Sequence, residues 1–472
     1  MVMGQLEIDT DVVIIGGGTG GYIAAIRAAD LGLNVTLIEE QDRLGGVCLI
    51  EGCIPSKTLI HAVELAESAK VAGEIGLSFG HIKIDIDKLR QWTQSVVDDL
   101  IRGVDFLVSK RGIEVITGRA RFASNKQVLI EGEGMAVNFK HAIIATGSCI
   151  NKLPGEYDLP LWTSADAVNI PEVPESLLVI GGGYIGLELG LVYHGLGTKI
   201  TMVEFLPELL AGADQDLVKV VVKRCQTKFE AIMTKSKVVG VTEGKDKRYA
   251  VQIQHEDSEE TLEFDQVLVC VGRRPNSSDL GLENTKIVPD ERGFIPTNSE
   301  CRTEEENIFA VGDVTHGPML AHKAAREGKV AAEVIANHPS AMDNRAIPAV
   351  VFTDPEIAWT GLTEREAKEE GITVNVGKFP LTALGRARSL GRTDGFVKIL
   401  SDPDTNLILG VGIVGTMASE LIAEGTLAIE MGATLEDLMV TIHPHPTLSE
   451  SLMEAAEVAA GSPTHILTRK LR

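Results

Sequence analysis

Two cysteines near the start of the chain could carry redox chemistry. Cys48 and Cys53 stand five residues apart in the segment GGVCLIEGCIPSK, which covers 45–57. An ideal helix would separate them by a rise of about 7.5 Å, whereas the Cα atoms of a disulfide usually lie about 4.4–6.8 Å apart. A helix must therefore be broken between them if they are to form a bridge, and Gly52 supplies the backbone freedom for that break.

Two other interpretations of this pair remain open from spacing alone. Both residues could be inert buried thiols, because free cysteine is among the most frequently buried residue types. The spacing also suits a zinc site, but the other cysteines are scattered singly and offer no second ligand pair. We therefore expect no metal. The remaining cysteines are Cys149, Cys225, Cys270 and Cys301.

A dinucleotide-binding pattern precedes the cysteines. An apolar run at 11–15 leads into a glycine-rich turn, an alanine-rich helix at 22–31 and a second strand at 35–38. Glycines at three fixed positions leave room for a tight turn, for a pyrophosphate and for close helix packing. The pyrophosphate would bind at the helix N-terminus, and the acid that ends the second strand would accept from a ribose hydroxyl. These residues are Gly16, Gly18, Gly21 and Glu39.

The same pattern returns 165 positions later. Strands at 177–180 and 199–203 enclose a second glycine-rich turn and helix. Two such halves imply two nucleotides, most economically a bound flavin and an exchanging nicotinamide. A carboxylate at Glu204 pairs with a free 2′-hydroxyl and would repel a 2′-phosphate, which favours NAD over NADP. The alternative is an acid that merely ends a strand. The second set is Gly181, Gly183, Gly186 and Glu204.

Short apolar strands mark where the chain leaves and re-enters these halves. The run at 142–147 closes the first half, the run at 267–271 closes the second, and the run at 307–313 returns to a strand that ends in an acid. We expect their polar or glycine ends to contact the nucleotides. Thr146, Gly147 and Asp313 are assigned to the flavin, and Gly272 to NAD.

The predicted fold class is α/β, with two Rossmann-like dinucleotide-binding domains, for FAD and NAD, and an α+β C-terminal domain, which the family resemblance given below implies is a dimerisation domain. The sequence pattern changes near residue 347, where a series of extended runs begins, and this change sets the last domain boundary. Extended runs are expected near 349–359, 374–379, 396–401 and 408–414. The predicted boundaries are 1–148 (FAD, first part), 149–277 (NAD), 278–346 (FAD, second part) and 347–472 (dimerisation).

Composition restricts the partners. The chain of 472 residues is 44% hydrophobic and 24% charged, as in ordinary globular proteins. Its net charge of −23 disfavours nucleic acid and anionic membranes, because both would be repelled. The first strand begins near the N-terminus, no run of about 20 apolar residues is evident, and a reducing compartment suits a cycling thiol pair. We expect a cytoplasmic protein; a mature organelle enzyme fits the same sequence.

Five motifs together resemble the flavin-dependent disulfide reductases over essentially the whole chain. They are GGxCx4CIPSK, GGGYIGLE, VGRRPN, AVGDV and HPTLSE, in the family's order. The resemblance implies that Cys48 is the thiol attacked by substrate and that Cys53 faces the flavin. It further implies that Asp313 binds the ribityl chain, that Lys57 pairs with Glu188 near the flavin, and that the C-terminal domain forms a homodimer.

The segment HPHPTLSE at 443–450 holds two histidines between prolines that deny it helix. By resemblance, His445 is the general base that reaches Cys48 of the partner subunit, and Glu450 orients its imidazole. Thr447 with Glu450 also fits a capping box for the helix that follows, and both roles could coexist. We interpret His443 as structural.

The resemblance implies oxidation of protein-bound dihydrolipoamide with reduction of NAD⁺, in 2-oxo acid dehydrogenase or glycine cleavage complexes. Glutathione and trypanothione reductases would prefer basic residues where Glu204 stands. Thioredoxin and mercuric reductases carry an extra C-terminal thiol pair, yet no cysteine follows Cys301. A non-catalytic flavin-bearing scaffold is the alternative from another class. One departure is Leu-Ile-Glu at 49–51, where Leu-Asn-Val is more familiar; it leaves both thiols in place.

Overall fold

The computed structural model describes residues 6–467 except 81, 133, 156–158, 245, 247 and 257. The chain divides into two compact units, and each is described by itself. Unit 1 comprises Met1–Leu153, Thr163–Pro171 and Val271–Asp343, and unit 2 comprises Pro154–Trp162, Glu172–Cys270 and Asn344–Arg472. Unit 1 is thus discontinuous in sequence.

Unit 1 is built on a seven-stranded sheet in the order β3-β2-β1-β6-β5-β4, with β16 paired to β6. Its centre is parallel: β1 pairs with β2 on one side and β6 on the other. The segments 12–15, 35–38 and 142–144 of these strands are buried without alternation because both faces are covered, which is the usual pattern for buried parallel strands. The strands are β1 Leu6–Ile15, β2 Val35–Glu39, β3 Glu114–Thr117, β4 Ala120–Ser124, β5 Gln127–Ile130, β6 Met135–Ile144 and β16 Ile308–Ala310.

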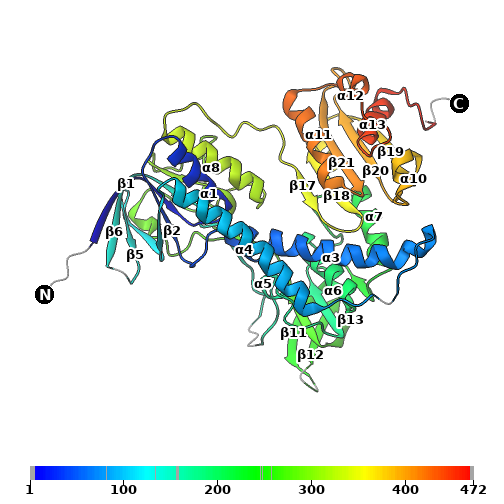
Figure 1. The fold of residues 1–472 in the computed structure, drawn as a ribbon, viewed down its shortest axis with the longest axis horizontal. Coiled ribbons are helices and arrows are strands. Elements are labelled where there is room, and N and C mark those ends of the chain that lie inside the picture. The colour runs from blue at the N-terminus through cyan, green and yellow to red at the C-terminus, as the bar shows by residue number, and fades with distance from the viewer. Residues whose placement is uncertain are drawn as a thin grey trace. The chain divides into compact units, whose positions relative to one another are not determined.

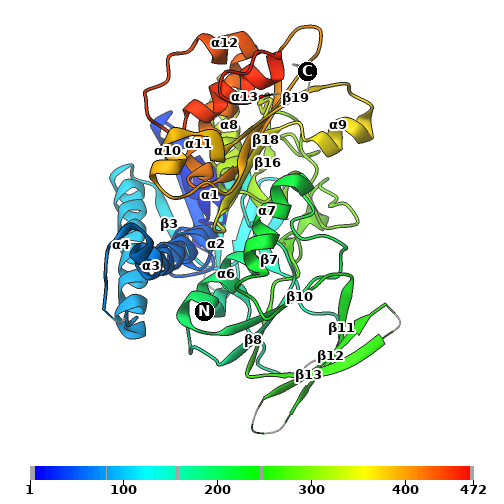
Figure 2. The same cartoon turned by 90° about the vertical axis from the view of Figure 1, so that its right-hand side faces the viewer.

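Two helix pairs complete unit 1. Helix α1 (Thr19–Asp30) packs against α8 (Ala321–Ile335), and both lie beside the sheet (Figure 1). Helix α3 (Cys53–Val71) packs along α4 (Ile86–Lys110), as Figure 2 also shows. The buried positions of α4 recur every three or four residues, which gives it one apolar face. A two-stranded sheet joins β7 (Ser148–Ile150) to β15 (Arg273–Pro275).

Unit 2 contains the second nucleotide-binding pattern. Strands β8 and β9 and the helix between them form the predicted βαβ unit, within a parallel sheet of order β10-β9-β8-β14. A three-stranded antiparallel sheet, β11-β12-β13, follows (Figure 2). The elements are β8 Ser176–Ile180, α6 Tyr184–Leu196, β9 Lys199–Val203, α7 Gln215–Cys225, β10 Ala231–Met233, β11 Ser236–Glu243, β12 Tyr249–His255, β13 Ser258–Phe264 and β14 Gln266–Val269.

The C-terminal part of unit 2 is an antiparallel sheet in the order β17-β18-β21-β20-β19. Helices α11 and α13 share one apolar core with this sheet. The single run expected at 349–359 is wrong: it forms two strands, with a turn between them that contains Pro355, which cannot donate to a ladder. The elements are β17 Ala349–Val351, β18 Glu356–Gly361, α9 Glu364–Glu370, β19 Asn375–Pro380, α10 Gly385–Ser389, β20 Phe396–Ser401, β21 Ile408–Gly415, α11 Ala418–Met431, α12 Leu435–Val440 and α13 Glu450–Ala460.

One expectation about membranes needs correction. Among the described residues, Gly46–Ile75 is long and apolar enough to cross a membrane by length and composition alone. This is weak evidence for a span, because core helices pass the same test. The segment is also interrupted between α2 (Gly46–Ile50) and α3, and it carries both cysteines.

Candidate dithiol and nucleotide sites

The helix is broken between the two cysteines, as predicted. Cys48 lies in α2, which ends at Ile50, and Cys53 is the first residue of α3. A Cβ atom on Gly52 would lie 2.7 Å from the carbonyl oxygen of Val47, so a side chain there would push the two helices apart. The break places the two sulfur atoms in hydrogen-bond contact. The two cysteines are not joined in a disulfide; Cys48 is half-buried and Cys53 is exposed.

The environment of Cys48 acts on its acidity in both directions. The hydrogen bond to Cys53 and burial raise the pKa of Cys48, and the nearby Cys53 charge adds to this. The hydroxyl of Thr19 and the ammonium of Lys57 lower the pKa of Cys48, but they do not offset the rise. Thr19 is the first residue of α1, so the thiol lies at the N-terminus of the first nucleotide-binding helix.

The loop before Cys48 is attached to the first glycine turn. Gly45 donates its N–H to the carbonyl of Gly17 across 2.9 Å, and Gly45 also forms an isolated β-bridge with Gly18. The two glycine-rich segments therefore run backbone against backbone. A nucleotide pyrophosphate held by the glycine turn would lie beside the dithiol.

The first and third predicted glycine positions are sterically required in both copies. A Cβ atom on Gly21 would lie 1.8 Å from the carbonyl oxygen of Gly16, and one on Gly186 would lie 2.1 Å from that of Gly181. Gly16 and Gly181 also adopt φ angles of +105° and +111°, which disfavour any side chain. These cradles fit a dinucleotide, because they keep the helix N-terminus open to a phosphate group.

The acid at the end of each second strand accepts a backbone hydrogen bond from the glycine-rich turn of the same unit. The sequence analysis did not predict this contact. Glu39 accepts the N–H of Gly17 at 2.6 Å, and Glu204 accepts that of Gly182 at 2.6 Å. The second oxygen of each accepts one further backbone N–H, from Gln41 at 2.9 Å and from Leu206 at 2.7 Å. A carboxylate has about four acceptor positions. Both acids therefore keep the capacity to bind a ribose hydroxyl.

Asp313 belongs to a polar chain in unit 1. The hydroxyl of Ser148 donates to Asp313 Oδ2 at 2.6 Å, and Arg273 Nε donates to that hydroxyl at 2.8 Å. Ser148 and Arg273 were not among the predicted site residues. The Gly-Arg-Arg-Pro-Asn motif could have indicated these residues, because its first arginine, Arg273, begins β15. This strand pairs with β7, which begins at Ser148.

Thr146, Gly147 and Gly272 lie close to this chain in unit 1. The hydroxyl of Thr146 donates to the carbonyl of Asn276 at 2.6 Å, and Asn276 donates its N–H to the carbonyl of Gly147 at 2.9 Å. The carbonyl of Gly272, which the sequence analysis assigned to NAD, accepts the N–H of Asn151 at 3.0 Å. Gly272 thus falls in unit 1, with the first nucleotide pattern.

His445 and Glu450 form the predicted pair. His445 Nδ1 lies 2.8 Å from Glu450 Oε1, and Glu450 Oε2 accepts the N–H of Thr447 at 2.8 Å. Burial raises the pKa of Glu450, but the contacts with Thr447 and His445 outweigh it and hold the pKa below its usual value. The His445 side chain is 77% exposed. Its Nε2 edge can therefore reach a thiol outside the chain's own core.

The capping box expected from Thr447 and Glu450 forms only in part: Glu450 accepts the N–H of Thr447, but the Thr447 hydroxyl does not cap the helix. Helix α13 begins at Glu450 with Ser449 as its N-cap, so Glu450 is the first helical residue and not the third. The Thr447 hydroxyl donates to the carbonyl of Pro444 at 2.7 Å instead of capping the helix. His443, interpreted as structural, has a buried side chain whose Nε2 lies 2.7 Å from Glu424.

Lys57 and Glu188 belong to different units, so their predicted pairing stays a prediction. Lys57 Nζ lies 3.3 Å from the Ser56 hydroxyl. Glu188 is buried in α6, and its Oε1 accepts the N–H of Phe352 at 3.0 Å. A buried carboxylate held by a backbone donor is positioned rather than mobile.

An acidic cluster in unit 2 has the spacing of a metal site. Asp214, Asp216 and Glu364 bring carboxylate oxygens together, but the buried Lys398 Nζ lies 2.6–2.9 Å from all three. Lys378 Nζ adds contacts of 2.7 Å to Asp216 and 2.9 Å to Glu364. Two ammonium groups thus offset two of the three carboxylate charges.

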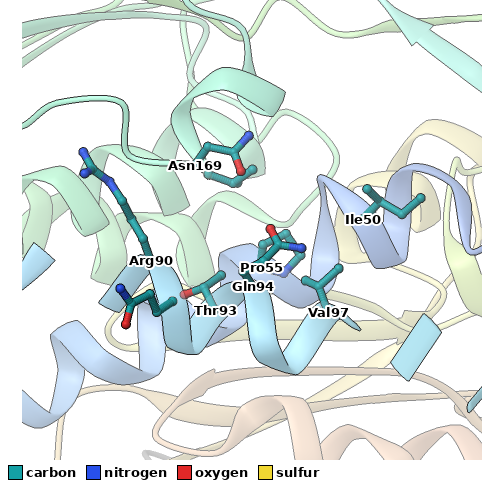
Figure 3. A pocket seen from close by; sticks show the side chains of 9 residues that line it. Ile50, Pro55, Arg90, Thr93, Gln94, Val97 and Asn169 are labelled. Atoms are coloured by element: carbon teal, nitrogen blue, oxygen red, sulfur yellow. The ribbon is translucent and has the colours of Figure 1, made fainter. Parts of the chain in front are cut away.

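A pocket of about 230 Å³ lies beside the dithiol loop in unit 1 (Figure 3). Its apolar lining residues include Pro55, and Arg90, which also lines it, donates to the carbonyls of Ile170 and Pro171. Neither cysteine lines it, and its lining carries no carboxylate or thiol. We therefore assign it no chemical step. It is lined by Ile50, Pro55, Arg90, Gln91, Thr93, Gln94, Val97, Val168 and Asn169.

A dithiol attached to one dinucleotide-binding turn, with a second such turn in the chain, defines a nucleotide-dependent dithiol–disulfide oxidoreductase. Residues 10–328 match the family model of pyridine nucleotide-disulphide oxidoreductases, and 347–456 match the family's dimerisation domain. The chain belongs to this family. It is an NAD-dependent flavoprotein oxidoreductase that uses FAD and NAD, and its dimerisation domain supports a homodimer.

Curated relatives cover the whole chain. It is 48% identical over 474 residues to the dihydrolipoyl dehydrogenase of Geobacillus stearothermophilus, covering 99% of this chain and 100% of the relative. It is 46% identical to that of Bacillus subtilis (strain 168), with the same coverage. Among solved structures, LpdA of Mycobacterium tuberculosis matches with a TM-score of 0.87 and 27% identity, covering 95% of this chain and 99% of the other. The predicted fold class is confirmed.

Proposed function

We propose that the chain is a dihydrolipoyl dehydrogenase, which oxidises protein-bound dihydrolipoamide and reduces NAD⁺. The observation that supports this proposal is the backbone attachment of the dithiol loop to the first glycine turn, because a dinucleotide held by that turn would lie beside the cysteine pair. The curated relatives bearing that name match the chain from end to end.

The protein residues perform thiol–disulfide exchange. His445, oriented by Glu450, removes a proton from one substrate thiol. The resulting thiolate attacks Cys48 of the Cys48–Cys53 disulfide, and Cys53 leaves as a thiolate. The second substrate thiol, deprotonated in turn, attacks the substrate sulfur of the mixed disulfide. This step releases the cyclic disulfide and leaves Cys48 reduced, so two electrons have passed to the cysteine pair.

FAD, when bound, supplies two-electron transfer between the reduced cysteine pair and NAD⁺. In this proposal, Cys53 faces the flavin, and Lys57 pairs with Glu188 near it. The FAD residues are Gly16, Gly18, Gly21, Glu39, Lys57, Thr146, Gly147 and Asp313, from segments 1–148 and 278–346. The NAD residues are Gly181, Gly183, Gly186, Glu204 and Gly272, from segment 149–277.

The proposed assembly is a homodimer formed by segment 347–472, in which His445 acts on Cys48 of the partner subunit. The imidazole of His445 is exposed and is held by Glu450, the first residue of α13, and this arrangement suits a role across an interface. The proposed partners are lipoylated domains of 2-oxo acid dehydrogenase or glycine cleavage complexes, in the cytoplasm. A pull-down from native extract, read for lipoylated proteins, would identify the complex; recovery of none would contradict this part.

Lipoamide-dependent oxidation of NADH by the purified chain, reconstituted with FAD, tests the proposed activity. We expect turnover with lipoamide and little with glutathione disulfide. A chain that binds FAD but turns over neither disulfide would be a scaffold, and the proposal would fail.

A further inference from the structure

A buried ion pair lies on α8 in unit 1, away from the two cysteines. Lys323 and Glu327 are only 5% and 6% exposed, and Lys323 Nζ lies 2.9 Å from Glu327 Oε1. Burying two charges is costly unless their remaining hydrogen-bonding positions are also used. The contacts that use them therefore indicate what the pair does.

Both charges hold the turn that carries Asp313. Glu327 Oε2 accepts the N–H of Gly312 at 2.7 Å, and Lys323 Nζ donates to the carbonyl of Gly312 at 3.2 Å. Lys323 Nζ also donates to the hydroxyl of Thr315 at 2.9 Å. Gly312 has a φ of +82°, which glycine adopts readily and most other residues do not. The peptide groups on both sides of Gly312 are thus clamped by one ion pair.

The clamped turn sets the direction of the Asp313 carboxylate. Asp313 follows Gly312 directly, and its Oδ2 is held from the other side by Ser148. Fixing the backbone at one end and a carboxylate oxygen at the other leaves the second oxygen, Oδ1, in a defined place. A preorganised acceptor binds a hydroxyl better than a mobile one, because less conformational freedom is lost on binding.

The ion pair is itself fixed relative to the first nucleotide-binding helix. A Cβ atom on Gly328 would lie 2.5 Å from the carbonyl oxygen of Gly20, so α8 and α1 touch along their backbones at this level (Figure 1). Glu327 stands next to Gly328 in the chain. The turn that carries Asp313 is held by α8, and the pyrophosphate-binding turn leads into α1. Both turns are therefore anchored to the same pair of closely packed helices.

We propose that Lys323 and Glu327 are positioning residues for FAD, which act through Asp313 by holding its carboxylate where the polyhydroxyl chain of the cofactor must bind. This inference rests on the proposed function, because it takes Asp313 as a flavin ligand. Neither residue of the ion pair touches the cofactor in this account. Their effect on FAD must therefore disappear when the Asp313 carboxylate is absent.

A double-mutant cycle on the full-length protein tests this. FAD dissociation constants are measured by reconstitution of the apoprotein for wild type, Glu327→Gln, Asp313→Asn and the double variant. We expect each single change to weaken FAD binding by about tenfold, the size of one lost charge-assisted hydrogen bond. The double variant should bind FAD about as weakly as Asp313→Asn alone. Effects that multiply would assign Glu327 a merely structural role and overturn the inference.

Controls separate this inference from the proposed function. Glu333→Gln removes another α8 carboxylate, which pairs with Arg27 and does not contact the turn, and should leave FAD affinity unchanged. If Asp313→Asn leaves FAD affinity unchanged, the proposed role of Asp313 fails. If only Asp313→Asn has an effect, the ion-pair inference alone fails.

A milder variant decides the case in which Glu327→Gln does not fold. Thr315→Val keeps the ion pair and removes the hydroxyl that Lys323 contacts, which itself donates to the carbonyl of Gly312 at 2.8 Å. We expect weaker FAD binding that again vanishes in the Asp313→Asn background. Unchanged FAD affinity in folded Thr315→Val would contradict the proposal.

Discussion

Gly46 and Gly18 approach each other so closely that a Cβ atom on Gly46 would lie 2.6 Å from the Cα atom of Gly18. Gly46 begins the helix with Cys48, and Gly18 is the N-cap of the first nucleotide-binding helix. The dithiol and the pyrophosphate turn are thus set at a fixed separation by backbone contact, without an intervening side chain.

Gly46→Ala should displace this contact. The added methyl group meets backbone, which cannot move aside, and Gly46 has a φ of +59°. We expect the free energy of unfolding to fall by about 1–3 kcal/mol, together with weaker FAD binding and lower lipoamide turnover. Urea denaturation and FAD titration measure these effects. Gly103→Ala is the control, because a Cβ atom there meets nothing within 4 Å; equal effects in both variants would contradict the account.

Replacing Cys53 should make Cys48 more acidic. The hydrogen bond from Cys53 is the largest contribution that raises the pKa of Cys48, and the charge of Cys53 adds to it. In Cys53→Ala both contributions are lost, so the pKa of Cys48 falls. The rate of iodoacetamide alkylation, followed against pH in the reduced protein, should then rise at lower pH than in wild type. An unchanged or higher midpoint would show that the two sulfurs do not interact as described.

Glu204→Ala should weaken discrimination between the two nicotinamides. In the proposed function this carboxylate binds a ribose hydroxyl and would repel a 2′-phosphate, and in the structure it accepts the N–H of Gly182. We expect kcat/KM with NAD to fall about tenfold, and the preference over NADP to shrink further because the repulsion is lost. Steady-state kinetics with both nucleotides measure this. The exposed neighbour Glu208, replaced by alanine, should change neither value; a preserved NAD preference in Glu204→Ala would exclude this role.

Glu450 should contribute stability that depends on pH. Its folded-state pKa is lowered, so its contribution is fully present above its unfolded pKa and is lost as pH falls through the folded pKa. Glu450→Gln should therefore be less stable than wild type at pH 7, and the difference should shrink on acidification. Urea denaturation at several pH values checks this. A difference that grows toward low pH would have the wrong sign.

The same variant should slow catalysis through His445. The carboxylate accepts from Nδ1 and so keeps Nε2 available as the base. We expect kcat/KM for dihydrolipoamide to fall about tenfold or more in Glu450→Gln, while NADH oxidation by an acceptor that takes electrons directly from the flavin is preserved. Loss of both reactions would point to general damage.

Local sequence patterns predicted the two glycine-rich turns and the break between the two helices that carry the cysteines. The two glycine-rich turns are legible because their geometry depends on neighbours within five residues, as the contact of Gly21 with Gly16 shows. The helix break at Gly52 was predictable for the same reason. These features need no knowledge of the remaining chain.

Contacts between distant segments were not predictable. The hydrogen bond from Ser148 to Asp313 joins residues 165 positions apart. The hydrogen bond from the Gly312 N–H to Glu327 depends on how α8 packs against α1. The capping box is incomplete because the Thr447 hydroxyl donates to the carbonyl of Pro444 and the helix begins only at Glu450. Such tertiary pairings override local preference.

The central claim is that the Cys48–Cys53 pair carries electrons between dihydrolipoamide and FAD. The most direct measurement is an anaerobic titration of the FAD-loaded protein with dihydrolipoamide, followed by absorbance, on wild type, Cys53→Ser and the control Cys149→Ser. We predict a long-wavelength thiolate–flavin band and full turnover in wild type and in Cys149→Ser, and neither in Cys53→Ser. Retention of the band and of lipoamide turnover in Cys53→Ser would contradict the account.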